Sequence, residues 1–141
     1  MVDRRDLLDL VFAGALNSLG AGRYFVVDYP ADQAALARTR VDDEGREVAE
    51  RFELVVDGVE IANGYQELTD ASVMATRMAS DQLVREADGR PSPAPDQRLL
   101  AAMTDGLPDC AGVAVGFDRL VMRAIGAGRI DEVMTFPFDR A

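Results

Sequence analysis

The sequence predicts an α+β fold built around an antiparallel hairpin near the middle of the chain. Residues 51–70 read RFELVVDGVEIANGYQELTD, two strand-forming runs joined by Asp57-Gly58. That dipeptide is favoured in two-residue hairpin turns because both positions need positive φ. Helical patterns precede and follow this stretch. With 48% hydrophobic and 28% charged residues among 141, the composition is typical of one globular domain or part of one.

The first third of the chain predicts a helix, a strand and a loop. Residues 3–19 form an amphipathic helix closed by Gly20, with apolar side chains at helical spacing: Leu7, Leu8, Val11, Phe12, Ala15, Leu16 and Leu19. Residues 23–29, RYFVVDY, predict a buried strand that ends at Pro30. Residues 38–50 are highly charged, and we expect an exposed loop there.

The chain after the hairpin predicts two helices, a strand and a last helix within a single partial domain, residues 1–141. Thr69 or Asp70 caps a helix that runs to about residue 87. Its candidate buried positions are Val73, Met74, Met78 and Leu83. A Pro-rich connector leads to a short helix capped by Asp96 and closed by Gly106. Residues 112–117 predict a buried strand, after which Asp118 caps a helix to about residue 127.

The hairpin suggests a metal–nucleotide site. With a turn at Asp57-Gly58, Glu53 and Glu60 share one face as diagonal neighbours, roughly 5–8 Å apart at the Cβ atoms. Two such carboxylates repel unless a proton or a cation lies between them. Mg²⁺ takes one or two protein carboxylates and completes its shell with water and phosphate oxygens. The alternative is a solvated outer face on which both carboxylates point to water.

The second strand adds polar side chains that suggest an amino-group pocket. Asn63, Tyr65 and Glu67 have the opposite parity to Glu60, so a common pocket requires a bulge near Ala62-Asn63-Gly64, which Gly64 permits. Asn63 and Glu67 together could hold a cationic ligand such as an amino group. The alternative is a polar edge strand.

Near the carboxyl end, Arg119 is expected in the first turn of a helix, where the helix dipole disfavours a cation. A bound phosphate would engage both the arginine and the helix end. Gly112 and Gly116 on the preceding strand would let a ligand approach the backbone closely. The alternative is an ordinary exposed arginine.

Composition excludes several classes of function. The chain has one cysteine, Cys110, and no histidine, which excludes internal disulfides, zinc fingers and Cys-His or Ser-His-Asp mechanisms. A net charge of −10 argues against nucleic acid binding by this chain. No apolar run reaches the roughly 18 residues of a membrane span, and the start of the chain is charged, unlike a signal peptide. We therefore expect a cytoplasmic protein that binds no membrane.

Two motifs carry a resemblance to a known family. ERFELVVDGVEIANGYQELTD, residues 50–70, resembles a segment of class II lysyl-tRNA synthetases, and GVAVGFDR, residues 112–119, resembles class II motif 3. The likeness is strongest to the GenX or PoxA family, a short paralogue that attaches β-lysine to elongation factor P. It runs from about Tyr24 to Ala141. The resemblance implies an antiparallel sheet flanked by helices that activates an amino acid with ATP as an adenylate and then transfers it.

The resemblance also implies roles for the residues at the nucleotide. Glu53 and Glu60 would bind Mg²⁺ and ATP. Arg119 would be the catalytic residue, stacking on adenine and reaching the phosphates of ATP. In-line attack of a carboxylate on the α-phosphate needs positioning and charge neutralisation rather than a strong base.

Other residues would then line the amino acid pocket. Asn63, Tyr65 and Glu67 would contact lysine or β-lysine, with Glu67 near an amino group and Gly112 at the substrate. Ala114 discriminates within the family, since lysyl-tRNA synthetases usually carry glycine there and the ligases carry alanine. The extra methyl is consistent with a β-amino acid, and the alternative is a neutral exchange in a strand.

The sequence departs from the family in one large respect. Motif 1, the dimer interface of this homodimeric family, and motif 2, the source of the arginine on the α-phosphate, are not found here. We therefore expect the C-terminal half of a catalytic core, from a truncated or split reading frame, that is inactive alone. Elongation factor P is the expected acceptor. The alternatives are a lysyl-tRNA synthetase fragment and a non-catalytic remnant or binding module.

Overall fold

The computed structural model describes residues 4–140, and its helices and longer strands follow the predicted order. The helices are α1 (Arg4–Ser18), α2 (Ala71–Ala87), α3 (Gln97–Gly106) and α4 (Phe117–Ile125). The strands are β1 (Arg23–Pro30), β2 (Thr39–Val41), β3 (Glu47–Val56), β4 (Val59–Gln66) and β5 (Ala111–Val115). Short 3₁₀ turns complete the chain: η1 (Ala31–Gln33), η2 (Ile130–Glu132) and η3 (Phe138–Arg140). No helix within residues 4–140 is long and apolar enough to cross a membrane.

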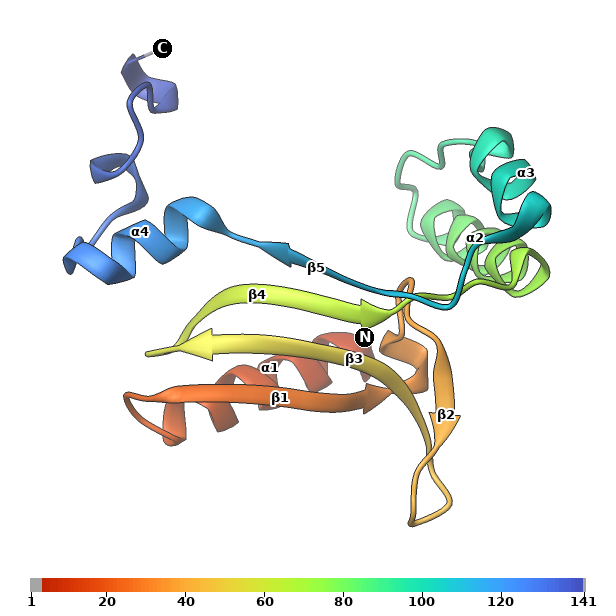
Figure 1. Ribbon diagram of the computed structural model, residues 1–141, viewed down its shortest axis with the longest axis horizontal. Helices are drawn as coiled ribbons and strands as arrows, with labels where there is room; N and C mark the ends of the chain where they lie inside the picture. Colours follow the sequence, from red (N-terminus) through yellow and green to blue (C-terminus); the bar gives the residue numbers. More distant parts are fainter. Residues whose placement is uncertain (1–3, 141) are drawn as a thin grey trace. The chain divides into compact units, whose positions relative to one another are not determined.

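The strands form one sheet in the order β1-β3-β4-β5, with β2 paired to β3 off this path. The arrows of neighbouring strands point in opposite directions in Figure 1. β2 and β3 pair antiparallel, with Thr39 opposite Ala49. The predicted α+β fold with an antiparallel sheet is therefore confirmed.

The predicted exposed loop over residues 38–50 is wrong, because this segment forms β2, a turn and the first part of β3. Asp42 closes the turn by accepting hydrogen bonds from the backbone N–H groups two and four residues later, at 2.9 and 2.8 Å. Gly45 supplies the left-handed position, with φ of 80°. The many charged residues of this segment favoured a loop, although the segment also contains Val48 and Ala49, which are buried.

The strands β1 and β5 were both predicted to be buried, and that expectation is wrong for this chain. On β1 only Tyr29 is buried, while Phe25 is 66% exposed. No residue of β5 is buried, and neither is any residue of α1 from position 7 onward. Apolar composition reports strand propensity, whereas burial needs a covering layer, and side chains such as Phe25 stay largely exposed among residues 4–140.

The chain divides into two compact units. The first unit consists of Met1–Val27, Phe52–Gly64 and Val113–Ala141. The second unit consists of Asp28–Arg51 and Tyr65–Gly112. The prediction of a single domain over residues 1–141 stays a prediction.

The second unit has a small apolar core between two helices. The helices α2 and α3 pack side by side in Figure 1. Their contact buries Leu68, Met74 and Met103 together. Met78 packs partly buried against this cluster, whereas the other two predicted core positions of α2, Val73 and Leu83, are exposed.

Helix starts follow the predicted caps in two of three cases. The carboxylates of Asp70 and Asp96 each accept hydrogen bonds from two N–H groups in the first turn of α2 and α3. Asp118 was the third predicted cap, and this is wrong. The helix α4 begins at Phe117, with Gly116, two residues before Asp118, as its N-cap and no side-chain cap. Aspartate is preferred at an N-cap and glycine is tolerated, so the sequence pattern favoured Asp118 over Gly116.

Candidate nucleotide and amino acid site

The turn between β3 and β4 has the geometry that the sequence predicts. Asp57 and Gly58 have φ of 49° and 78°, so both central positions are left-handed. The Asp57 carboxylate accepts a hydrogen bond from the Gly22 N–H at 2.9 Å, and the Asp57 N–H donates to the Gly22 carbonyl at 2.8 Å. This double contact fixes the hairpin to the start of β1 within the first unit.

Glu53 and Asn63 meet on this hairpin. Glu53 is only 9% exposed, and its Oε1 accepts a hydrogen bond from Asn63 Nδ2 at 3.2 Å. Regular alternation from the turn would put these two side chains on opposite faces. The contact brings the two side chains together all the same, and the bulge expected near Ala62-Asn63-Gly64 stays a prediction. Asn63 Oδ1 is buried and has no hydrogen-bond partner within residues 4–140.

Glu60 and Arg119 form the second contact of the first unit. Arg119, in the first turn of α4, donates from Nη1 to the Glu60 carbonyl at 2.9 Å. The same nitrogen lies 3.6 Å from Glu60 Oε2. Both side chains are nearly half exposed. Arg119, the cation at the start of α4, was expected to need a bound phosphate. It is instead paired with the Glu60 carboxylate, and its half-exposed side chain can still face a ligand.

The two hairpin glutamates offer oxygen donors only. Within residues 4–140, no three or more acidic, cysteine or histidine side chains gather closely enough to hold a metal ion by themselves. Mg²⁺ binds proteins through one or two carboxylates plus substrate phosphates and water. Glu53 contacts Asn63 and Glu60 contacts Arg119, so the assignment of Mg²⁺ to the two glutamates stays a prediction.

Glu67 is held between two segments of the second unit. Its backbone N–H donates to the Cys110 carbonyl at 2.9 Å, and it pairs in an antiparallel bridge with Ala37. Gly112 leaves room for the Glu67 carboxylate, because a Cβ at position 112 would lie 2.4 Å from Glu67 Oε1. A larger residue at position 112 would therefore displace the Glu67 carboxylate from its present place.

Tyr65 lies beside a cation. The Arg51 guanidinium lies 5.9 Å from the centroid of the Tyr65 ring and 4.3 Å from that of the Tyr29 ring. Arg51 also donates a hydrogen bond to the Gln33 carbonyl at 3.0 Å. These contacts restrict where the Tyr65 ring can lie.

The predicted site residues thus form three contacting pairs. Within the first unit these are Glu53 with Asn63 and Glu60 with Arg119. Within the second unit the pair is Glu67 with Gly112. Ala114, on β5 in the first unit, is exposed. The Tyr65 ring lies near the Arg51 guanidinium.

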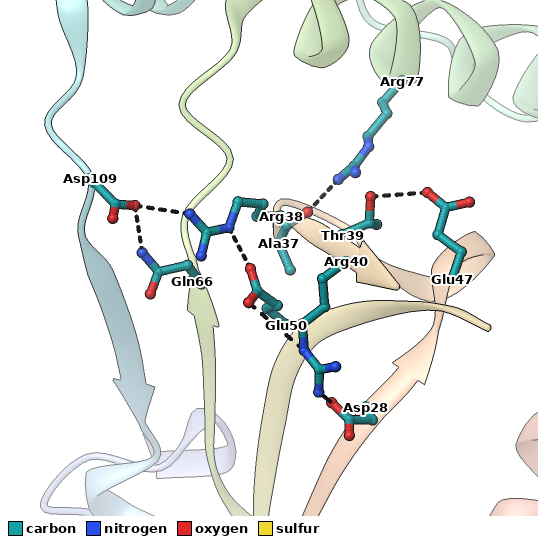
Figure 2. Close-up of polar contacts among 10 residues, drawn as sticks. All are labelled: Asp28, Ala37, Arg38, Thr39, Arg40, Glu47, Glu50, Gln66, Arg77 and Asp109. Atoms are coloured by element: carbon teal, nitrogen blue, oxygen red, sulfur yellow. Dashed lines mark hydrogen bonds and ion pairs between the residues drawn. The ribbon is translucent and has the colours of Figure 1, made fainter. Parts of the chain in front are cut away.

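The second unit contains a polar network that was not predicted from the sequence (Figure 2). Asp109 Oδ1 accepts hydrogen bonds from Gln66 Nε2 at 2.7 Å and from Arg38 Nη1 at 3.3 Å. Arg38 also donates to Glu50, and this hydrogen bond is the main reason that the pKa of Arg38 is raised. Arg40 bridges Glu50, 3.9 Å from Arg40 Nε, to Asp28, 2.7 Å from Arg40 Nη2.

The signal for this network was the spacing of charges. Arg38 and Arg40 are two residues apart, as are side chains on one face of a strand. The reading of residues 38–50 as a loop concealed that pattern. Asp109 gave no local signal, because its partners are distant in sequence.

The class of protein follows from a comparison with known families. Residues 11–140 match the family described as tRNA synthetases class II (D, K and N). This chain therefore belongs to the class II tRNA synthetase family, as its antiparallel sheet and motifs suggested.

The relatives narrow the likeness further. The chain is 48% identical, over 99% of its length, to the "Elongation factor P--(R)-beta-lysine ligase" of Klebsiella pneumoniae and to that of Edwardsiella ictaluri. It is 46% identical to the protein of the same name in Mannheimia succiniciproducens, again over 99%. The chain spans 43% of the length of each of these curated relatives.

Proposed function

We propose that this chain carries the amino acid pocket and part of the nucleotide site of an ATP-dependent ligase. The enzyme activates lysine or β-lysine as an adenylate and transfers the acyl group to a lysine of elongation factor P. The observation that carries the proposal is the 46–48% identity, over 99% of the chain, to ligases of that name.

In this proposal the first unit binds the nucleotide. Glu53 and Glu60 hold Mg²⁺ and ATP, and bound Mg²⁺ supplies neutralisation of phosphate charge. Arg119 engages ATP from the start of α4. The half exposure of the Glu60–Arg119 pair supports this role, because a nucleotide can reach both side chains without unfolding the hairpin.

The remaining residues bind the amino acid. Glu67 accepts an amino group, Asn63 and Tyr65 line the pocket, and Gly112 admits the substrate beside Glu67. The buried Asn63 Oδ1 without a hydrogen-bond partner supports this assignment, because an ammonium group would satisfy it. Alanine instead of glycine at position 114 favours β-lysine over lysine.

A lysyl-tRNA synthetase activity is the second candidate. The family match includes the synthetases for lysine, which favours this reading. Ala114 and the net charge of −10 favour a protein acceptor instead.

ATP–pyrophosphate exchange by the purified chain tests the proposal. Exchange driven by β-lysine supports the ligase, and exchange driven by lysine alone supports the synthetase. Absence of exchange with either amino acid, from a chain shown to be folded, contradicts independent activation by these residues. Transfer of labelled β-lysine to elongation factor P then separates a protein acceptor from tRNA.

A further inference from the structure

The first unit exposes many large apolar side chains. They come from α1, β1, β5 and α4, and the second unit exposes fewer of them among the described residues. Six that are more than half exposed are Leu10, Val11, Phe25, Val27, Val113 and Ile125. An extended apolar surface of this kind marks a site of interaction with another polypeptide.

The two edges of the sheet are open and unguarded. Within residues 4–140, β1 pairs only with β3 and β5 pairs only with β4. An open edge presents unpaired N–H and C=O groups, and proteins usually protect it with charged residues, proline or a covering segment. β5, AGVAV, contains neither a charged residue nor proline, and nor does the YFVV stretch of β1. Both edges are therefore suited to pairing with a further strand.

The side chains on these edges offer apolar contacts to such a strand. Phe25 and Val27 share one face of β1 by strand alternation, and they are 66% and 57% exposed. The Phe25 ring lies 5.8 Å from the Phe52 ring on β3, so it rests against the sheet. Val113 and Val115 share a face of β5 in the same way, and both are more than half exposed. An added strand would gain backbone hydrogen bonds and apolar burial together.

A second copy of this chain fits the two edges poorly. Each copy carries a net charge of −10, so two copies repel each other. A twofold contact uses the same patch on both copies. Because β1 and β5 are at opposite ends of the strand order, such a contact would cover one edge and leave the other open.

The curated relatives indicate a better occupant. The ligases of Klebsiella pneumoniae and Mannheimia succiniciproducens match 99% of this chain, but the chain spans only 43% of their length. More than half of each ligase therefore lies outside the matched stretch. That remaining part is longer than this chain and is large enough to reach both edges.

We propose that β1 and β5 are docking edges for the part of the ligase that lies outside the matched stretch. This part adds a strand at each edge and covers Phe25, Val27, Val113 and Val115. The inference goes beyond the proposed function, because it rests on exposure, strand order and the length of the relatives and not on the reaction.

Co-expression tests the docking edges. The complete 141-residue chain is produced with a tagged polypeptide that corresponds to the part of the Klebsiella pneumoniae ligase outside the matched stretch. Affinity capture followed by light scattering should show a complex of one copy of each. The intact Klebsiella pneumoniae ligase, tagged in the same way, is the control and should capture no chain, because its own matched stretch already occupies the docking partner.

Charged substitutions locate the contact. Val27→Lys and Val115→Lys should each weaken the association at least tenfold in titrations of the captured partner, because each buries a charge at an apolar contact. Leu83→Lys is the matched control and should stay within about twofold, since Leu83 is 68% exposed on α2 in the second unit.

Several results would overturn the proposal. These are the absence of a complex, equal capture by the intact ligase, and an affinity that neither Val27→Lys nor Val115→Lys changes. A homodimer of the chain alone that Val27→Lys dissociates would also overturn it, in favour of a second copy as the occupant.

Hydrogen exchange of the unmodified chain tests the same edges without any variant that has to fold. Backbone amides of β1 and β5 that exchange rapidly in the chain alone should exchange at least tenfold more slowly in the complex, whereas the amides of α2 should not change. Unchanged exchange in both strands would contradict docking at the edges.

ATP–pyrophosphate exchange by the complex separates this inference from the proposed function. A complex that protects β1 and β5 but shows no exchange with lysine or β-lysine would support the docking edges and contradict the proposed function. Exchange by the chain alone, without a complex, would support the proposed function and overturn the docking edges.

Discussion

At the scale of single residues, the proposed nucleotide site depends mainly on Glu60 and Arg119. They come from the hairpin and from the first turn of α4, and they meet at 3.6 Å while both remain nearly half exposed. An exposed pair of this kind contributes about 0–1 kcal/mol to stability. Its loss should therefore alter ligand binding far more than folding.

We predict that Glu60→Ala lowers the affinity for Mg-ATP by at least tenfold, measured by isothermal titration calorimetry with and without Mg²⁺. The loss of one Mg²⁺ ligand is the physical reason. Glu86→Ala is the control, because Glu86 is an exposed glutamate on α2. Unchanged affinity in Glu60→Ala would contradict the metal assignment.

A substitution at Gly112 can distinguish an effect on amino acid binding from an effect on stability. We predict that Gly112→Ala displaces the Glu67 carboxylate and weakens lysine or β-lysine binding by about tenfold or more. The new Cβ meets the far end of a flexible side chain, so the cost in unfolding free energy should stay near 1 kcal/mol or below.

Titration of the amino acid and thermal melting of the same variant check this prediction. Gly14→Ala is the control, since a Cβ there meets nothing within 4 Å and alanine favours a helix. Full amino acid affinity in Gly112→Ala would show that Glu67 does not bind the substrate from its present position.

At the scale of elements, the helix starts depend on ionised caps. The Asp70 carboxylate accepts hydrogen bonds from the Ser72 hydroxyl and from the Val73 and Ser72 N–H groups, and these bonds lower the pKa of Asp70. A lowered folded-state pKa stabilises the protein above the unfolded-state pKa. That stabilisation is lost as the pH falls through the lowered value.

We predict that Asp70→Asn flattens the acid side of the stability profile. Asparagine keeps the cap acceptor but does not titrate, so the variant should lose less stability than the original chain below about pH 4. Thermal melting between pH 7 and pH 3, compared between the two proteins, isolates this residue from the other carboxylates. Parallel profiles would show that Asp70 contributes no pH dependence.

At the scale of the whole molecule, charge limits the choice of partner. The chain carries 25 acidic and 15 basic residues, for a net charge of −10. Binding to a nucleic acid backbone requires a basic surface that neutralises phosphates. The charge balance thus agrees with a protein acceptor and disfavours tRNA.

We predict that the chain retains no tRNA in filter binding at protein concentrations up to roughly 10 μM and about 0.15 M salt. The reason is the electrostatic repulsion between the anionic chain and the anionic tRNA. Saturable retention that weakens as salt is raised would instead support the lysyl-tRNA synthetase reading.

Local sequence patterns suffice for the turns, most helix caps and the order of the elements. The Asp57-Gly58 turn, the caps at Asp70 and Asp96 and the order of the helices and longer strands depend on residues close in sequence, and all were predictable. The loop expected over residues 38–50 was wrong because its charges concealed the buried Val48 and Ala49. The assignment of Asp118 as a cap failed by two residues, since Gly116 is the N-cap, which is within the usual uncertainty of a helix boundary.

The sequence alone determined the fold class, the family and the identities of the candidate residues, because periodicity, turn chemistry and motifs are encoded over short stretches. Only the tertiary structure decided which side chains meet. It paired Glu53 with Asn63 and Arg119 with Glu60, and it revealed Asp109 as the shared partner of Gln66 and Arg38. Such contacts join segments as much as 71 residues apart, and no local pattern specifies them.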